Sequence, residues 1–321
     1  MKVGLALGSG AARGLAHIGA IKVLKKNKIP IDIIAGSSMG ALIGGAYASG
    51  LKVETMEEIA TNVDWKLTAK MFSPTVSFSG FIDGKRISDF LGHIIGNKNI
   101  EDLDIRFACV ATDIFSGEEI VIDQGSLIEA IRASISIPVF FTPVKHKDSF
   151  LVDGGIVNPV PVDLARRLGA DTVIAVNVIP QISYSLKKSK MKRGKTSKRN
   201  KKELNSRKIN MALANYIKNR INNMSGILKV NELLKKVEKE KLDSPNFINI
   251  FLNTINIFEG EIIKLKLEIN QPDFLIEPDT SPINSREFYK AEEAIKAGER
   301  ATEKIIPDIK SIIKDYKGGK E

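Results

Sequence analysis

Hydrophobic residues in the first 180 positions follow two alternating patterns. Short, nearly continuous apolar runs predict buried strands, and longer stretches with apolar residues at helical spacing predict amphipathic helices. The strands are predicted at residues 2–7, 31–35, 106–111, 118–122, 150–152 and 172–178. The helices are predicted at residues 12–26, 38–49, 52–62, 85–95, 127–134 and 160–168. This alternation predicts an α/β fold, a three-layer sandwich with a mainly parallel central sheet covered by helices on both faces.

The pattern changes between residues 181 and 258. A basic run is followed by two long helix-like stretches, 210–224 and 228–241. Then comes Phe247–Phe258, whose Asn and Thr residues fall roughly on one side of a helical wheel. After Gly260 the α/β pattern returns, with an edge strand at 273–278 and a helix at 288–314. We therefore predict one α/β domain formed by residues 1–180 and 259–316. A basic, mainly helical insertion, residues 181–258, interrupts it.

The composition is that of an ordinary globular protein. The chain has 321 residues, of which 43% are hydrophobic and 27% charged, and this length can bury one large core or two small ones. The single cysteine, Cys109, excludes a disulfide framework. The sequence begins directly with a predicted strand, without the regions of a signal peptide. It also lacks an uninterrupted apolar run of about 18 residues, so we expect a cytoplasmic protein without a transmembrane helix.

The positive charge is concentrated in one segment. The formal net charge is +10, yet residues 187–208 alone contain twelve Lys or Arg residues and one Glu. One interpretation is a peripheral contact with an anionic membrane, to which each basic residue contributes about 1 kcal/mol, and to which Phe247–Phe258 adds an apolar face. The other is a solvated basic loop. Nucleic-acid binding is less favoured, because the run contains no aromatic residue on which a base could stack.

The first candidate motif is Gly36-Ser37-Ser38-Met39-Gly40, which lies between a predicted strand and a predicted helix. In this context G-x-S-x-G indicates a nucleophile elbow, a tight turn that exposes the serine hydroxyl at the edge of the sheet. Gly36 and Gly40 remove the side chains that would clash in such a turn. Ser38 is therefore a candidate nucleophile at a helix N-terminus. The alternative is a simple Gly/Ser-rich turn.

The second candidate motif is the loop Gly8-Ser9-Gly10-Ala11-Ala12-Arg13-Gly14, between the first strand and the first helix. Its small residues allow backbone N–H groups to converge on an anion, either a phosphate or the oxyanion of an acyl-transfer reaction. The dinucleotide fingerprint G-x-G-x-x-G fails, because the third glycine comes one residue late. A Walker A lysine is also missing. The oxyanion interpretation fits better, since sequential strands are usually neighbours and would bring Ser38 close to this loop.

A serine nucleophile needs a base, and none of the three histidines, His17, His93 and His146, lies in a strand-end loop late in the chain. Asp153-Gly154-Gly155 follows the predicted strand 150–152, and an Asp at that position can serve instead. Its pKa must then be raised by burial and by a hydrogen bond to Ser38, because an ordinary Asp is a poor base at neutral pH. The alternative is an Asp that stabilises only its own turn.

These three motifs, in this order, resemble those of the patatin-like phospholipases, especially bacterial and archaeal proteins related to the catalytic domain of neuropathy target esterase. The segments Ala111-Thr112-Asp113, Arg132-Ala133-Ser134 and Ile137-Pro138 are similar to that family as well. The resemblance covers about residues 1–180 strongly and 272–316 more weakly. It departs at Ser9 and Ala11, where the family usually has glycine.

The resemblance implies a patatin-like fold and a serine lipid acyl hydrolase: a phospholipase, lysophospholipase or carboxylesterase acting on lipid or fatty-acyl esters. Ser38 would be the nucleophile of a Ser–Asp dyad and Asp153 its base. The oxyanion hole would lie in Gly10-Ala11-Ala12-Arg13-Gly14, with donors around Gly10 and Ala11 and support from Arg13. No metal or other cofactor is expected. The alternatives are a catalytically idle regulatory protein on the same fold, or a membrane- or nucleic-acid-binding protein.

Overall fold

The computed structural model describes residues 1–63, 84–180 and 247–318. The chain divides into two compact units, Met1–Ile182 with Phe251–Glu321, and Ser183–Ile250. The basic run 187–208 and the predicted helices at 210–224 and 228–241 lie outside the described residues. The extent of the insertion, 181–258, stays a prediction. The account below concerns the first unit and the helix that leads into it.

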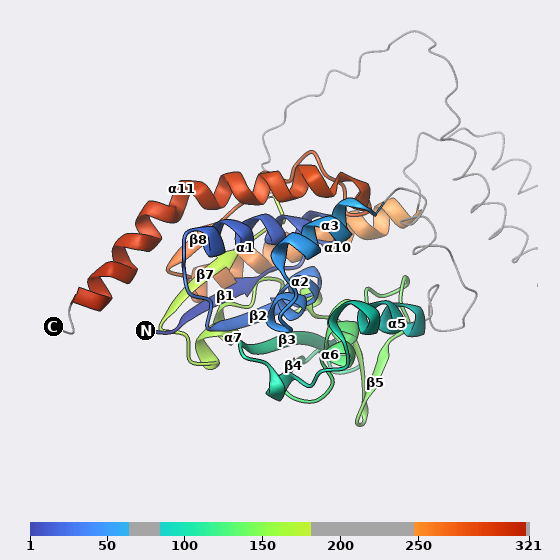
Figure 1. Cartoon of the computed structure of the whole chain (residues 1–321). Helices are drawn as coiled ribbons and strands as arrows, with labels where there is room; N and C mark the ends of the chain where they lie inside the picture. Colours follow the sequence, from blue (N-terminus) through green and yellow to red (C-terminus); the bar gives the residue numbers. More distant parts are fainter. Residues whose placement is uncertain (64–83, 181–246, 319–321) are drawn as a thin grey trace, which may run out of the picture. The chain divides into compact units, whose positions relative to one another are not determined.

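An eight-stranded sheet forms the middle of this unit, in the order β5-β6-β3-β2-β1-β7-β8, with β4 also paired to β3 (Figure 1). The parallel strands are β1 (Val3–Leu7), β2 (Ile33–Ser37), β3 (Arg106–Asp113), β7 (Thr172–Val176) and β8 (Phe274–Ile276). The antiparallel strands are β4 (Glu119–Ile122), β5 (Val144–His146) and β6 (Ser149–Asp153). The prediction of a mainly parallel sheet is confirmed.

Helices cover both faces of the sheet. Side chains alternate along β1, so that Leu5 and Leu7 join one core cluster and Ala6 joins the other. The first cluster takes in α1 (Ala16–Lys26), α2 (Met39–Ala48), α3 (Val53–Thr61), α5 (Gly84–Ile95), α6 (Leu127–Ser134) and α11 (Ala291–Gly318). The second takes in α7 (Val162–Arg167) and α10 (Phe247–Ile269). Short 3-10 helices complete the fold: η1 (Ala11–Leu15), η2 (Ile100–Asp102), η3 (Gly154–Ile156) and η4 (Phe288–Lys290). The three-layer prediction is therefore confirmed.

Helices α1 and α11 lie side by side on their face of the sheet (Figure 1). A Cβ atom at Gly19 of α1 would overlap the backbone of Ile295, and one at Gly298 of α11 would overlap that of Ala16. The two glycines thus allow the helix backbones to touch. Through this contact the C-terminal segment completes the layer that covers the sheet.

Two elements differ from the sequence patterns. The short hairpin strand β5 was not predicted, because a three-residue strand with polar residues gives too little alternation to detect. Helix α10 passes through Gly260, where the sequence suggested a return to the α/β pattern. A glycine inside a helix costs only about 1 kcal/mol, and the buried Ile263 and half-buried Leu267 beyond it pack against the sheet. Among the described helices, none is long and apolar enough to cross a membrane.

Candidate active site

Ser38 stands at the turn between β2 and α2, with backbone dihedral angles φ 52° and ψ −120°. A residue other than glycine adopts this conformation only at a cost of about 1–3 kcal/mol, and such strain concentrates at functional sites. A Cβ atom at Gly36 would lie 2.5 Å from the Cα atom of Ala41, and one at Gly40 would overlap the carbonyl group of Leu7. Both glycines are therefore sterically required, as a nucleophile elbow demands.

Asp153 ends β6 and meets Ser38 directly. The Ser38 hydroxyl donates a hydrogen bond of 2.6 Å to Asp153 Oδ2, and the Gly155 N–H donates one of 2.8 Å to Oδ1. The two residues lie 115 positions apart in the sequence. They meet because β2 and β6 pair with successive residues of β3, where Val110 is opposite Ser37 and the next residue, Ala111, is opposite Asp153. Strand β4 pairs with the other side of β3.

Hydrogen bonds with Ser134, Thr112 and Ser136 hold this pair in place. Ser134 Oγ accepts a hydrogen bond of 2.9 Å from the Ser38 N–H and donates one of 2.6 Å to the carbonyl oxygen of Val110. Thr112 Oγ1 donates to the carbonyl oxygen of Asp153 at 2.8 Å, and the Asp153 N–H donates to that of Ser136. Only the family resemblance points to Thr112 and Ser134 in the sequence, and no spacing argument identifies their role.

Burial governs the charge of Asp153, which is only 4% exposed. Removal from water raises the pKa of its carboxyl group to about 7, and the hydrogen bonds from Ser38 and Gly155 offset part of this rise. A carboxylate with this pKa accepts protons far more readily at neutral pH than an ordinary Asp. The geometry and the electrostatics therefore suit a proton exchange between Ser38 and Asp153.

The Gly8–Gly14 loop packs against the elbow. Gly10 has φ 148° and Ala11 has φ 50°, so the chain turns sharply before η1 begins. A Cβ atom at Gly14 would overlap the side chain of Met39, which places the loop in contact with the residue after Ser38. The predicted loop and the predicted elbow are thus neighbours.

Only part of this loop has N–H groups to offer to an anion. The Ala12 N–H already donates to the carbonyl oxygen of Ser285, and the Arg13 N–H to that of Gly10. The Gly10 and Ala11 N–H groups have no acceptor within the described part of the chain. The N–H groups of Gly10 and Ala11 are therefore available to an anion, and the oxyanion hole at Gly10–Gly14 stays a prediction.

The Arg13 side chain braces the loop. Its Nε–H donates to the carbonyl oxygen of Ile283 at 2.8 Å, and its Nη1–H donates to Asn256 Oδ1 of α10 at 3.1 Å. His17 is fully buried and bonds the carbonyl oxygen of Gly8 through Nε2 at 2.7 Å, while burial lowers its pKa to about 4. The neutral His17 therefore donates its Nε2–H to the carbonyl oxygen of Gly8 and so supports the start of the loop.

Glu259 of α10 is a second buried carboxyl group at this site. Its Oε1 atom occupies the space that a Cβ atom at Gly155 would fill, next to the side chain of Ser9. Sequence analysis missed it, because it lies directly beyond the stretch assigned to the insertion. The only signal was an acidic residue immediately after the run of apolar and amide residues in 247–258.

The remaining candidates lie elsewhere. His93 bonds the carbonyl oxygen of Asp89 within α5, and His146 belongs to β5. Within the residues that the structure describes, no group of three or more His, Cys, Asp or Glu side chains could hold a metal ion.

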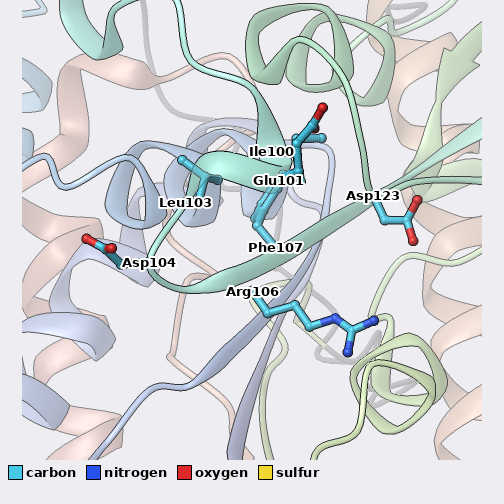
Figure 2. Close-up of a pocket in the computed structure, with 7 residues that line it drawn as sticks. All are labelled: Ile100, Glu101, Leu103, Asp104, Arg106, Phe107 and Asp123. Carbon is cyan, nitrogen blue, oxygen red and sulfur yellow. The ribbon is translucent and has the colours of Figure 1, made fainter.

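A separate pocket lies at the start of β3, at the edge of the sheet opposite to Ser38 (Figure 2). It is lined by Ile100, Glu101, Leu103, Asp104, Arg106, Phe107 and Asp123. Figure 2 shows that Glu101, Asp104 and Asp123 point in different directions. Since these carboxyl groups do not converge, the pocket does not form a second candidate site.

The chain is similar to several known proteins. The model of the family described as patatin-like phospholipase matches residues 5–166. An NTE family protein of Mycobacterium tuberculosis is 39% identical over 177 residues, which are 55% of this chain and 49% of that protein. The lysophospholipase NTE1 of Debaryomyces hansenii is 34% identical over 182 residues, which are 55% of this chain and 12% of that protein. The chain thus spans about half the length, or less, of these curated relatives. The crystal structure of VipD from Legionella pneumophila aligns over 96% of this chain and 66% of that one, with a TM-score of 0.45 and 12% identity.

Proposed function

The chain belongs to the patatin-like phospholipase family, and we propose that it is a serine hydrolase of lipid or fatty-acyl esters that works through an acyl-enzyme on Ser38. The observation that carries the proposal is the 2.6 Å hydrogen bond from the Ser38 hydroxyl to Asp153 Oδ2. The NTE family relatives, one of them named a lysophospholipase, support an acyl ester as substrate.

Acylation begins when Ser38 Oγ attacks the ester carbonyl carbon and its proton passes to Asp153 Oδ2. The tetrahedral intermediate collapses as Asp153 returns that proton to the leaving alcohol. Water then gives a proton to Asp153 and attacks the acyl carbon, and the fatty acid leaves as Ser38 regains its proton. Asp153 can act in both directions because its pKa of about 7 lies near neutral pH.

The negative charge of the tetrahedral intermediate would be held by the N–H groups of Gly10 and Ala11. These donors belong to a loop that Arg13, His17 and Asn256 already brace, so little reorganisation is needed when the charge develops. Loss of one such donor typically costs about 10²–10³-fold in rate. The loop is thus the second element that supports the proposal.

A fluorophosphonate probe tests the function directly. We expect the purified protein to gain the mass of one phosphonyl group, located on the peptide that contains Ser38, with heat-denatured protein as the control. Turnover of p-nitrophenyl esters of increasing chain length would then define the acyl preference. A protein that is neither labelled nor active on any ester would contradict the proposal and favour a catalytically idle member of the family.

Contact with an anionic membrane forms a further part of the proposal. The basic run 187–208 lies outside the described residues, but α10 supports the idea. Three of its large apolar side chains, Ile257, Phe258 and Leu265, are 46%, 63% and 58% exposed. Exposed apolar residues grouped on one helix are typical of helices that lie in a membrane interface.

We expect the double substitution Phe258→Ser and Leu265→Ser to weaken binding to anionic vesicles about tenfold, because two apolar side chains no longer enter the interface. Co-sedimentation with phosphatidylglycerol vesicles measures the effect. Ile312→Ser is the matched control, since Ile312 is an exposed apolar residue of α11. Equal binding by the double variant and the control would contradict the contribution of α10.

A further inference from the structure

Glu259 lies where the two halves of the proposed site meet. It is 7% exposed, and its Oε1 atom touches Gly155, the residue whose N–H holds Asp153 Oδ1. Ser9, at the start of the loop that carries Gly10 and Ala11, lies next to the same point. The Glu259 carboxyl group therefore fills the junction between the Asp153–Gly155 turn and the Gly8–Gly14 loop.

Two charged groups face Glu259 there. Asp153 approaches from β6 and Arg13 from η1. Arg13 is already engaged by Asn256, which lies one turn before Glu259 on α10, and by the carbonyl oxygen of Ile283. Glu259 thus lies between one carboxyl group and one guanidinium group, and ionisation of both Glu259 and Asp153 would place two negative charges close together in a site with little water.

The protonation state of Glu259 follows from these surroundings. Burial raises its pKa to about 8, with a further contribution from the charge of Asp153, and the Ser9 hydroxyl and Arg13 offset part of this rise. Two buried carboxyl groups this close resist ionising together. Since the Ser38 hydroxyl donates to Asp153, Asp153 is the group that accepts a proton and Glu259 is the one that stays protonated near neutral pH.

We propose that Glu259 is a positioning residue that supports the dyad and the oxyanion loop only as a neutral carboxylic acid. This inference rests on the function proposed above. When neutral, it packs the loop against the Asp153–Gly155 turn without adding charge. When ionised, it repels Asp153 and places a negative charge beside the N–H groups that would hold the oxyanion. Its ionisation therefore switches the site off at alkaline pH.

The pH profile of kcat/KM tests this role. In the wild type, activity falls below about pH 7 as Asp153 is protonated, and above about pH 8 as Glu259 loses its proton. We expect kcat/KM to be at least about tenfold lower at pH 9.5 than at pH 7.5. Glu259→Gln keeps the shape but cannot ionise, so its profile should stay level over that interval. Glu261→Gln, an exposed residue of the same helix, should keep the wild-type decline.

Infrared spectroscopy provides a readout that does not depend on turnover. In the wild type, the carbonyl band of protonated carboxyl groups should disappear between pH 7.5 and 9.5, and Glu259→Gln should keep only the smaller part of that change that Asp153 contributes. An alkaline decline that persists in Glu259→Gln, or a carbonyl band that does not respond to pH, would overturn the role of Glu259. A wild type that shows the band change but hydrolyses no ester would instead contradict the proposed function and leave the protonation of Glu259 intact.

Discussion

Ser38→Ala is expected to reduce ester hydrolysis to the rate of buffer alone. The substitution removes the one atom proposed to form the acyl-enzyme, and loss of a nucleophile typically costs at least about 10³-fold in kcat. The main-chain hydrogen bond from residue 38 to Ser134 does not involve the lost hydroxyl, so the turn should keep its geometry. Steady-state turnover of a p-nitrophenyl ester at neutral pH measures the loss.

Ser37→Ala is the matched control for this prediction. Ser37 is the preceding residue, is fully buried in β2, and has no role in the proposed reaction. It should retain turnover and should still react with the fluorophosphonate probe. Substantial hydrolysis by Ser38→Ala, in a preparation free of other esterases, would mean that a different group carries the acyl chain.

Asp153→Asn should abolish activity and stabilise the fold at the same time. The Asn oxygen can still accept from the Gly155 N–H, and its amide can still face Ser38, but it cannot take up the serine proton. We expect kcat to fall about 10³–10⁴-fold, the upper part of the range for loss of a general base. Rapid kinetics with an activated ester would locate the loss in acylation.

The stability effect depends on pH with a definite sign. The pKa of Asp153 is about 7 in the folded protein and near 3.8 when exposed. The folded state therefore holds a proton that the unfolded state releases, and the wild type loses stability as the pH rises from about 4 to 7. Asp153→Asn has no such proton to lose, so its melting temperature should exceed that of the wild type by an amount that grows from pH 4 to pH 8. An advantage that is the same at both pH values, measured by calorimetry, would argue against a raised pKa.

The local parts of the site could be predicted from the sequence for steric reasons. Gly36 and Gly40 surround Ser38 because the elbow leaves no space for their side chains, and this requirement is visible in five consecutive residues. The apolar runs also located the parallel strands, since strands buried on both faces contain few polar residues. The family resemblance, now shown by the match over residues 5–166, rests on these same short segments.

The long-range parts of the site could not be predicted. Glu259 contacts Gly155, and Asn256 contacts Arg13, only because α10 packs against the sheet. In the sequence these partners lie far apart. The residues of α10 have no periodic or turn signal that points to a distant loop. The same applies to Ser134, whose hydroxyl supports Ser38 from the end of α6. Such contacts become visible only when the register of β2, β3 and β6 is known.

Three strands at the borders of the sheet, β4, β5 and β8, each pair with a single neighbour and are only four, three and three residues long. A long, flat outer strand offers unpaired backbone groups to other molecules and promotes aggregation, whereas a short one gives them little to bind. Lys145, in the middle of β5, carries an exposed charge. Pro278 follows soon after β8 and cannot extend that strand, because proline has no N–H group to donate. The borders of the sheet therefore offer few backbone groups for pairing with a second molecule.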